Sequence, residues 1–172
     1  ADANARINLV SRRSTEEDLV AHVAEALAAA PFLPARRGFR LLDVGSGGGF
    51  PAIPLLLARR DVSGLLVESI GKKAAFLAEA CIRLRLTARV ANVRFPRSLP
   101  KEMPLFDVMT SRAVADPLGL AAAARPFLAP GSRALLYTTR AVLDASRPRM
   151  AHRFLPIPGS EQKGIALVEC FT

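Results

Sequence analysis

The strongest constraint on the fold is a short apolar run that leads directly into a glycine-rich turn. The run from Phe39 to Val44 predicts a buried strand, and the turn that follows it reads Gly45-Ser46-Gly47-Gly48-Gly49. Glycine lets the backbone turn sharply and approach a ligand without a side-chain collision. The amides that open the following helix can then hold a carboxylate or a phosphate. The pattern predicts an α/β fold with a ligand site at the end of this strand.

Downstream of the turn, apolar runs alternate with helical patterns. We predict strands at 64–67, 88–93, 106–110 and 134–138, and helices at 53–59, 71–86, 118–128 and 141–146. Two closing strands, 154–157 and 165–171, flank the short turn Pro158-Gly159-Ser160, which suits an antiparallel hairpin. The alternation predicts a doubly wound, Rossmann-like class I methyltransferase fold, with a mostly parallel seven-stranded sheet and a C-terminal antiparallel hairpin.

The chain of 172 residues is long enough for one domain and too short for two ordinary ones. We expect a single domain over 1–172, with a short helical extension at 1–38 and a Rossmann-like core at 39–172. The helix of the extension is capped by Ser14 or Thr15 and reaches Ala30. No apolar run approaches the roughly 20 residues of a membrane helix. We expect a cytoplasmic monomer without a membrane segment.

The two cysteines give no sign of a metal or redox site. Cys81 and Cys170 lie far apart, fit no metal-ligand spacing, and fall in apolar stretches. We interpret both as reduced core residues and expect no metal.

Two acidic residues help to separate the ligands that the glycine turn can hold. Asp43 lies two residues before Gly45, where its carboxylate repels a pyrophosphate but attracts the ammonium group of a methionine. Gly49 is followed by Phe50-Pro51, and the glycine that closes a dinucleotide fingerprint is missing. Glu68, at the end of the second strand, can accept both hydroxyls of a ribose. These features favour S-adenosylmethionine over a dinucleotide; a turn without any ligand is the remaining alternative.

The sequence also narrows the nucleophile that would take a methyl group. Methyl transfer from a sulfonium depends mainly on positioning. The segment after the fourth strand, Thr110-Ser111-Arg112-Ala113, disfavours exocyclic amines, and no loop cysteine serves carbon-5 pyrimidine chemistry. A ring nitrogen such as guanine N7 needs no base. Arg112 is the candidate catalytic residue, and it can bind the cofactor carboxylate, a substrate phosphate or a base edge.

Taken together, these segments resemble the bacterial 16S ribosomal RNA guanine-N7 methyltransferase family, also called glucose-inhibited division protein B. The resemblance is carried by Asp43 to Pro54 (DVGSGGGFPAIP), Glu68 to Leu77 (ESIGKKAAFL) and Phe106 to Ala113 (FDVMTSRA). Asn8-Leu9 followed by His22 is similar to the N-terminal helical region of the family. The resemblance implies S-adenosylmethionine as cofactor, a guanine in small-subunit (16S) ribosomal RNA as substrate, and that RNA or the small subunit as partner.

The candidate cofactor site combines the turn, the strand ends and the positions that the resemblance adds. Its residues are Asp43, Gly45, Ser46, Gly47, Gly49, Phe50, Glu68, Ser69, Arg97, Ser98 and Arg112. By resemblance, Gly45 and Phe50 contact the cofactor, and Arg112 lies in the cofactor and substrate pocket.

The sequence departs from the family pattern at several places. Arg97-Ser98 stands where an acid is expected after the third strand, Glu25-Ala26 where Asp-Ser is usual, and Thr138-Thr139 in place of a Lys-Gly pair. The N-terminal region is also shorter. These departures leave open a catalytically weakened or inactive relative that acts as a basic RNA-binding or ribosome-assembly protein.

The charge balance favours a polyanionic partner. Lys and Arg number 24 against 15 Asp and Glu, a net charge of +9. Basic residues concentrate in two stretches: Arg83, Arg85, Arg89, Arg94, Arg97 and Lys101 in the first, and Arg140, Arg147, Arg149, His152 and Arg153 in the second. Either stretch can follow an RNA backbone; a merely solvated face is the alternative.

Overall fold

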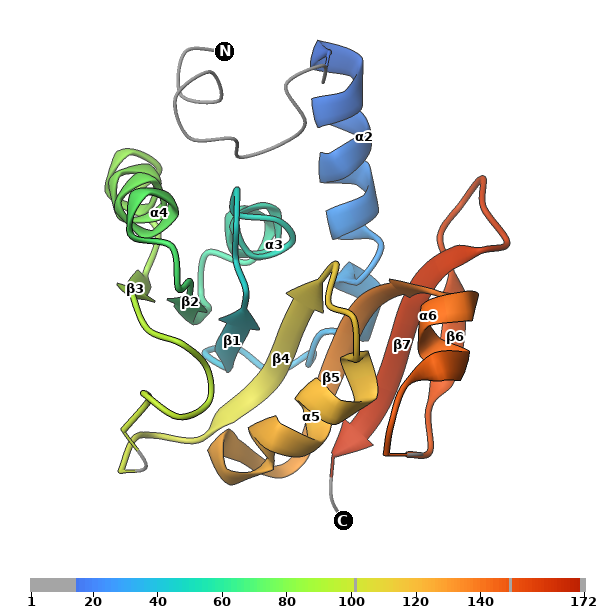
Figure 1. Cartoon of the computed structure of the whole chain (residues 1–172). Coiled ribbons are helices and arrows are strands. Elements are labelled where there is room, and N and C mark those ends of the chain that lie inside the picture. Colours follow the sequence, from blue (N-terminus) through green and yellow to red (C-terminus); the bar gives the residue numbers. More distant parts are fainter. Residues whose placement is uncertain (1–14, 101, 149, 171–172) are drawn as a thin grey trace.

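A computed structural model describes residues 15–100, 102–148 and 150–170, and its centre is one mixed sheet (Figure 1). Seven strands are ordered β3-β2-β1-β4-β5-β7-β6, and the first five run parallel to one another. β7 is antiparallel to both β5 and β6. The predicted parallel sheet and closing antiparallel hairpin are confirmed.

The structure sets the bounds of these elements. The strands are β1 Arg40–Val44, β2 Ser63–Val67, β3 Ala88–Ala91, β4 Phe106–Arg112, β5 Leu128–Thr139, β6 Arg153–Pro156 and β7 Lys163–Cys170. The α-helices are α2 Glu16–Leu27, α3 Ala52–Ala58, α4 Gly71–Arg83, α5 Pro117–Ala124 and α6 Arg140–Ala145. Short 3₁₀ turns cover Ala30–Phe32 and Arg125–Phe127.

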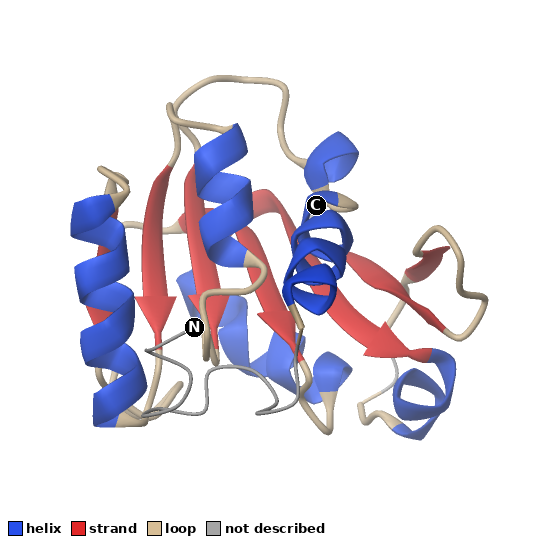
Figure 2. Ribbon diagram, turned by 90° about the horizontal axis from the view of Figure 1, so that it is seen from above, coloured by secondary structure: helices blue, strands red, loops and turns tan. Residues whose placement is uncertain are grey.

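Helices cover both faces of the sheet, as seen from above in Figure 2. On one face α3, α4 and the segment that follows α2 pack on alternate strand residues such as Leu41, Val108 and Leu135. On the other face α5 and α6 pack on Leu42, Met109 and Leu136. Because successive strand residues point to opposite faces, β1 is buried at four consecutive positions, from Leu41 to Val44. The predicted doubly wound architecture is confirmed.

Several predicted boundaries are wrong, mainly around proline. The helix expected over 118–128 ends at Ala124, because Pro126 lacks the amide that a continuing helix needs. β5 begins at Leu128 and passes through Pro130 and Gly131, which were expected to lie outside the strand. The first helix ends at Leu27, not at Ala30, and Thr15 caps it together with Asp18. The expected loop residues Ser111 and Arg112 belong to the end of β4.

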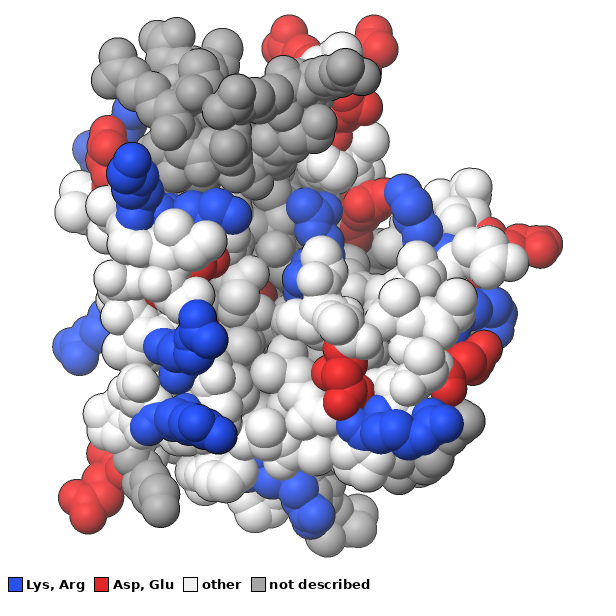
Figure 3. Space-filling view, viewed as in Figure 1, with Lys and Arg blue, Asp and Glu red and all other residues white. Residues whose placement is uncertain are grey.

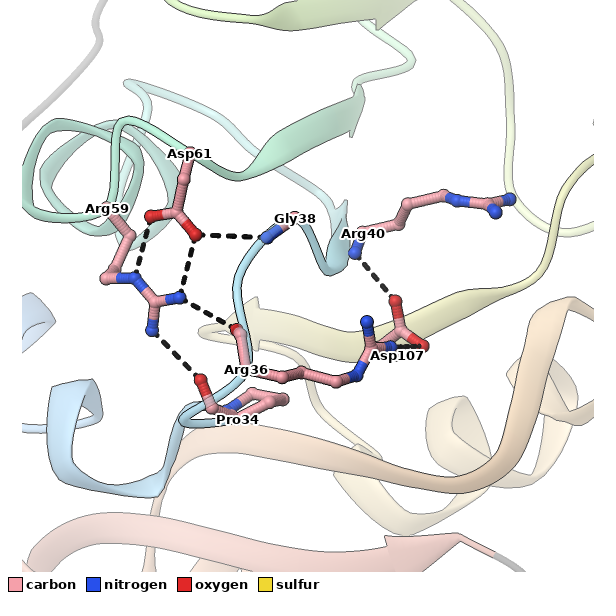
Figure 4. A network of polar contacts seen from close by, with 7 residues as sticks. All are labelled: Pro34, Arg36, Gly38, Arg40, Arg59, Asp61 and Asp107. Carbon is pink, nitrogen blue, oxygen red and sulfur yellow. Dashed lines mark hydrogen bonds and ion pairs between the residues drawn. The ribbon is translucent and has the colours of Figure 1, made fainter.

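A polar network joins the segment before β1 to the sheet (Figure 4). The Arg59 guanidinium pairs with Asp61 and donates to the carbonyl of Pro34 at 2.9 Å. Asp61 also accepts from the amide of Gly38 at 3.0 Å, and these bonds hold the pKa of Asp61 well below its usual range. The network sets the entry of β1, and so the place at which the glycine turn begins.

The chain before β1 also reaches β4. Asp107 of β4 accepts from the amide of Arg40 at 2.7 Å and pairs with the Arg36 guanidinium. In the part of the chain that the structure describes, no helix is long and apolar enough to cross a membrane.

Candidate cofactor and substrate site

The glycine turn closes over the ends of β1 and β2. Gly45, Gly47 and Gly49 have φ angles of 72°, 53° and 93°, in the left-handed region that side chains disfavour. The amides of Gly45 and Ser46 both donate to the carbonyl of Val67, at 2.9 and 3.1 Å. The turn therefore depends on β2 as well as on its own sequence.

Gly49 has a second reason to be glycine. A Cβ added there would lie 2.9 Å from Cγ1 of Ile53, a contact too short for real carbon atoms. The helix α3 can thus follow directly on the turn, with its first residues against the glycine backbone. This close approach brings the start of α3 to the carboxyl edge of the sheet, where ligands of doubly wound folds bind.

Glu68 holds the turn from the end of β2. Its carboxylate accepts from the amide of Gly47 at 2.9 Å and from the amide of Ile70 at 2.8 Å, and only 6% of the residue is exposed. Two backbone bonds fix the orientation of the carboxylate, while each oxygen keeps a lone pair for another donor. Glu68 is therefore placed beside the turn, as a ribose-binding role requires.

Asn92, which the sequence reasoning missed, completes this corner. Its side-chain amide donates to the backbone carbonyl of Glu68 at 2.8 Å. Asn92 directly follows β3, and a polar residue at the carboxyl end of a parallel strand is the signal that could have revealed it. The loop after β3 also carries Arg97 and Ser98, which were predicted to contact the cofactor. Both residues are exposed, and among the described residues no hydrogen bond or ion pair joins them to Glu68. Ser69 is exposed as well.

Asp43 is fully buried in β1, with one oxygen satisfied and one not. Oδ1 accepts from the Thr110 hydroxyl at 2.6 Å, and Oδ2 has no hydrogen-bond partner. Burial raises the pKa of Asp43 to about 6, although the hydrogen bond from Thr110 and the charge of Arg112 act in the opposite direction. An unpaired buried carboxylate oxygen is costly, and the ammonium group of a methionine is a donor that would satisfy it.

Arg112 stands where the turn, β4 and α2 meet. Its guanidinium carbon lies 5.3 Å from the ring centre of Phe50, and Nη1 lies 3.4 Å from Nδ1 of His22. Nη1 is also 3.6 Å from a carboxylate oxygen of Glu25. The structure thus brings the predicted residues Phe50 and Arg112 together. It adds His22 and Glu25 from α2, which lie 90 and 87 residues before Arg112 in the sequence.

A cavity of about 510 Å³ opens beside Arg112, over the carboxyl ends of β4 and β5. Its lining combines apolar side chains with Thr138, Thr139, Tyr137 and three charged groups. The charged groups are Glu25, Arg112 and Lys163. Tyr137 is buried in the core, and its hydroxyl donates to the carbonyl of Ala26, which holds α2 against the sheet. Arg112 therefore lies between the glycine turn and a cavity large enough for a nucleobase.

The residues present fit S-adenosylmethionine. Glu68 can hold the ribose, and the free oxygen of Asp43 can accept from the ammonium group. The glycine turn leaves backbone open between them, since a Cβ at Gly45 would meet nothing within 4 Å.

Of the described residues, Cys81 is buried and unpaired; the side chain of Cys170 lies outside the described part, as do Asn8 and Leu9.

The family model of rRNA small subunit methyltransferase G, GidB, matches residues 1–151. Among curated proteins, ribosomal RNA small subunit methyltransferase G of Acidiphilium cryptum is 36% identical over 169 residues, covering 95% of this chain and 76% of its own length. The proteins of the same name from Rhodopseudomonas palustris and Laribacter hongkongensis are 38% and 40% identical. They cover 82% and 74% of this chain, which spans only 63% and 60% of their lengths.

Solved structures agree on the fold. An S-adenosylmethionine-dependent O-methyltransferase from Thermotoga maritima superposes with a TM-score of 0.66 and 13% identity, covering all of this chain and 72% of its own. A putative O-methyltransferase from Klebsiella pneumoniae has the same TM-score at 17% identity, covering 99% of this chain and 87% of its own. The likeness confirms the predicted class I methyltransferase fold.

Proposed function

The chain belongs to the rRNA small subunit methyltransferase G family, and we propose that it transfers a methyl group from S-adenosylmethionine to N7 of a guanine in small-subunit (16S) ribosomal RNA. The observation that carries the proposal is the position of Arg112 between a buried carboxylate with a free oxygen and the cavity over β4 and β5. In this proposal Arg112 separates the cofactor site from the cavity that would take the substrate base.

The protein contributes mainly position and charge. Asp43 would hold the ammonium group and Glu68 the ribose of the cofactor, which supplies an electrophilic methyl group when it is bound. Guanine N7 has an exposed lone pair and loses no proton on methylation, so no general base is needed. Arg112 would orient the acceptor base or the cofactor carboxylate, at the boundary between the cofactor site and the cavity over β4 and β5.

The surface charge supports an RNA substrate. Figure 3 shows Lys and Arg side chains on the flank that carries α4 and β3, and Arg83, Arg85, Arg89 and Arg94 are all exposed. Exposed cations that are spread over one flank can follow a phosphate backbone. In the second basic stretch, Arg140, Arg147, His152 and Arg153 are exposed as well; Lys101 and Arg149 lie outside the described residues.

A second candidate function follows from the departures named above. Thr138 and Thr139 line the cavity at the place where a Lys-Gly pair is expected from the resemblance. Loss of the lysine of that pair favours a relative that binds ribosomal RNA without methylating it.

For either function we propose a monomer of one domain that acts in the cytoplasm, where its RNA substrate is assembled into subunits.

The test is transfer of tritiated methyl groups from S-adenosylmethionine to small ribosomal subunits that lack the modification. We expect incorporation at one guanine, detected as cleavage by borohydride and aniline at N7-methylguanine. Arg112→Ala should lower incorporation by at least ~100-fold with an unchanged circular dichroism spectrum, because Arg112 acts on the reacting groups. Arg37→Ala, which removes an exposed arginine from the opposite end of β1, is the matched control.

Two outcomes would contradict the proposal. Wild-type protein that binds S-adenosylmethionine and subunits without incorporation would favour the RNA-binding alternative. Wild-type turnover by Arg112→Ala would remove Arg112 from the site.

A further inference from the structure

Among the residues that the structure describes, Glu25 is the one acidic group in the lining of the cavity over β4 and β5. It lies near the end of α2, which the Tyr137 hydroxyl holds against the sheet through the carbonyl of the next residue, Ala26. The Glu25 side chain is 24% exposed and is therefore accessible from the cavity without being freely solvated. Its place is determined by the packing of α2, not by a flexible loop.

Arg112 and Lys163 flank this carboxylate as cations, and the imidazole of His22 lies beside it. One oxygen lies 3.6 Å from Arg112 Nη1 and 3.6 Å from His22 Nδ1, and the other lies 3.6 Å from Lys163 Nζ. Lys163 begins β7 directly opposite Thr139 of β5. All three separations exceed the 2.7–3.2 Å of a hydrogen bond. The carboxylate is thus held by charge, and its lone pairs remain available to a bound donor.

The remaining lining suits the flat face of a base. Ala113, Val114, Val142 and Ile157 supply apolar surface around the charged group. A nucleobase extruded from RNA is recognised by stacking on apolar side chains and by hydrogen bonds to its Watson–Crick edge. A single carboxylate in such a pocket selects a base that presents two neighbouring N–H donors.

We propose that Glu25 is the residue that selects guanine, by accepting from N1–H and from the 2-amino group of the target base. The inference rests on the proposed function and deepens it. Guanine carries these two donors on the edge opposite N7, so a base held by Glu25 presents N7 away from α2. Arg112, on the cofactor side of the cavity, is then placed to donate to O6. Adenine carries an acceptor at N1 and is repelled by the same carboxylate.

The test compares two bases in two proteins. Small subunits are reconstituted with guanosine or with inosine at the position that the wild-type protein methylates. Inosine differs from guanosine only in lacking the 2-amino group of the base. For the wild type we expect kcat/KM to be about 10-fold lower on inosine. For Glu25→Gln we expect kcat/KM on guanine to fall about 30-fold and the preference for guanine over inosine to shrink to about 2-fold or less. Glu161→Gln makes the same chemical change on the exposed β6–β7 hairpin and should behave as wild type.

Each outcome separates this inference from the proposed function. A preference for guanine that stays about 10-fold in Glu25→Gln would make Glu25 a structural ion-pair residue and overturn the inference while transfer itself stands. Absence of any transfer by the wild type would overturn the proposed function and the inference with it. If Glu25→Gln is too slow to rank the two bases, Glu25→Asp replaces it: retained charge should retain the guanine preference at a lower rate, and loss of that preference would count against the inference. Calorimetric titration with S-adenosylmethionine verifies that each variant keeps its cofactor site.

Discussion

At the scale of single residues, the protein keeps a carboxylate where burial makes it costly. Asp43 lies among strand residues with one oxygen unpaired, and its pKa is raised to about 6 by burial. The folded protein therefore holds a proton on Asp43 up to about pH 6, whereas the unfolded chain releases it near pH 4. The free energy of unfolding must therefore fall as the pH rises from about 4 to about 6. Above pH 6 the folded protein bears the full cost of a buried, ionised Asp43.

Replacement of Asp43 by Asn should relieve this cost. Above pH 6 we expect Asp43→Asn to raise the free energy of unfolding by up to about 3 kcal/mol, and near pH 4 we expect little difference from wild type. The same variant should bind S-adenosylmethionine at least ~10-fold more weakly, because an amide does not neutralise the ammonium group. Urea denaturation at pH 4 and 7.5 and calorimetric titration measure the two effects. A variant that is less stable than wild type at pH 7.5, with Asp144→Asn as surface control, would contradict this account.

At the scale of elements, one acidic side chain joins the helices α5 and α6. Asp116 caps α5 by accepting from the amide of Gly119 at 3.0 Å. The same oxygen accepts from the amide of Arg147 at 3.1 Å and from the Ser146 hydroxyl, and Ser146 in turn accepts from the amide of Leu118 at 2.9 Å. The start of α5 and the end of α6 are therefore one hydrogen-bonded unit. These bonds, with Ser146 first, lower the pKa of Asp116.

We expect Asp116→Ala to lower the free energy of unfolding by about 1–2 kcal/mol at pH 7, since it removes a helix cap and leaves Ser146 without its acceptor. Because the pKa of Asp116 is lowered on folding, its contribution is present above the pKa of the unfolded carboxyl and is lost as the pH falls through that of the folded one. The difference between variant and wild type should thus narrow in acid. Thermal unfolding from pH 7 to pH 3 measures it, with Asp144→Ala on α6 as control.

A constant difference across that pH range would show that Asp116 acts through packing and not through its charged hydrogen bonds. A difference as small as that of Asp144→Ala would show that the joined helix ends contribute nothing measurable.

At the scale of the whole molecule, charge is unevenly arranged around a largely apolar interior. Two apolar clusters, one on each face of the sheet, take most of the large side chains. The net charge of +9 lies outside them, and exposed arginines occur on α4, on β3 and after β3. A surface of this kind binds RNA through counterion release, which makes affinity depend steeply on salt.

The double variant Arg89→Gln and Arg94→Gln should weaken RNA binding about equally for any sequence. We expect the slope of log Kd against log salt concentration to fall by about 1–2, since each lost phosphate contact removes about 0.7–0.9. Filter binding to 16S ribosomal RNA between 50 and 200 mM salt measures the slope. Arg37→Gln, at the amino end of β1, should leave it unchanged; an equal decrease in both variants would mean that the RNA does not follow this flank.

The sequence by itself determined the order and type of most elements. The run into Gly45 predicted β1 and its turn, and the 3.6-residue period after Gly71 predicted α4. These predictions succeed because strand alternation, helical periodicity and glycine conformations are local properties of the chain. Asp43 and Glu68 were predicted as cofactor-binding residues in the same way, since strand ends in a doubly wound sheet are ligand positions.

Only the tertiary structure decided how the site is completed. β5 runs through Pro130-Gly131 because it pairs with β4 on both sides of them, Leu128 with Phe106 and Arg133 with Val108, and this pairing outweighs the local preference for a turn. Asn92 contacts Glu68 because β2 and β3 are neighbours in the sheet. The order β4-β5-β7 and the anchored end of α2 place Glu25, Arg112 and Lys163 around one cavity. The same packing brings His22 beside Arg112. Contacts between segments 90 residues apart depend on which strands pair, and no local pattern encodes that pairing.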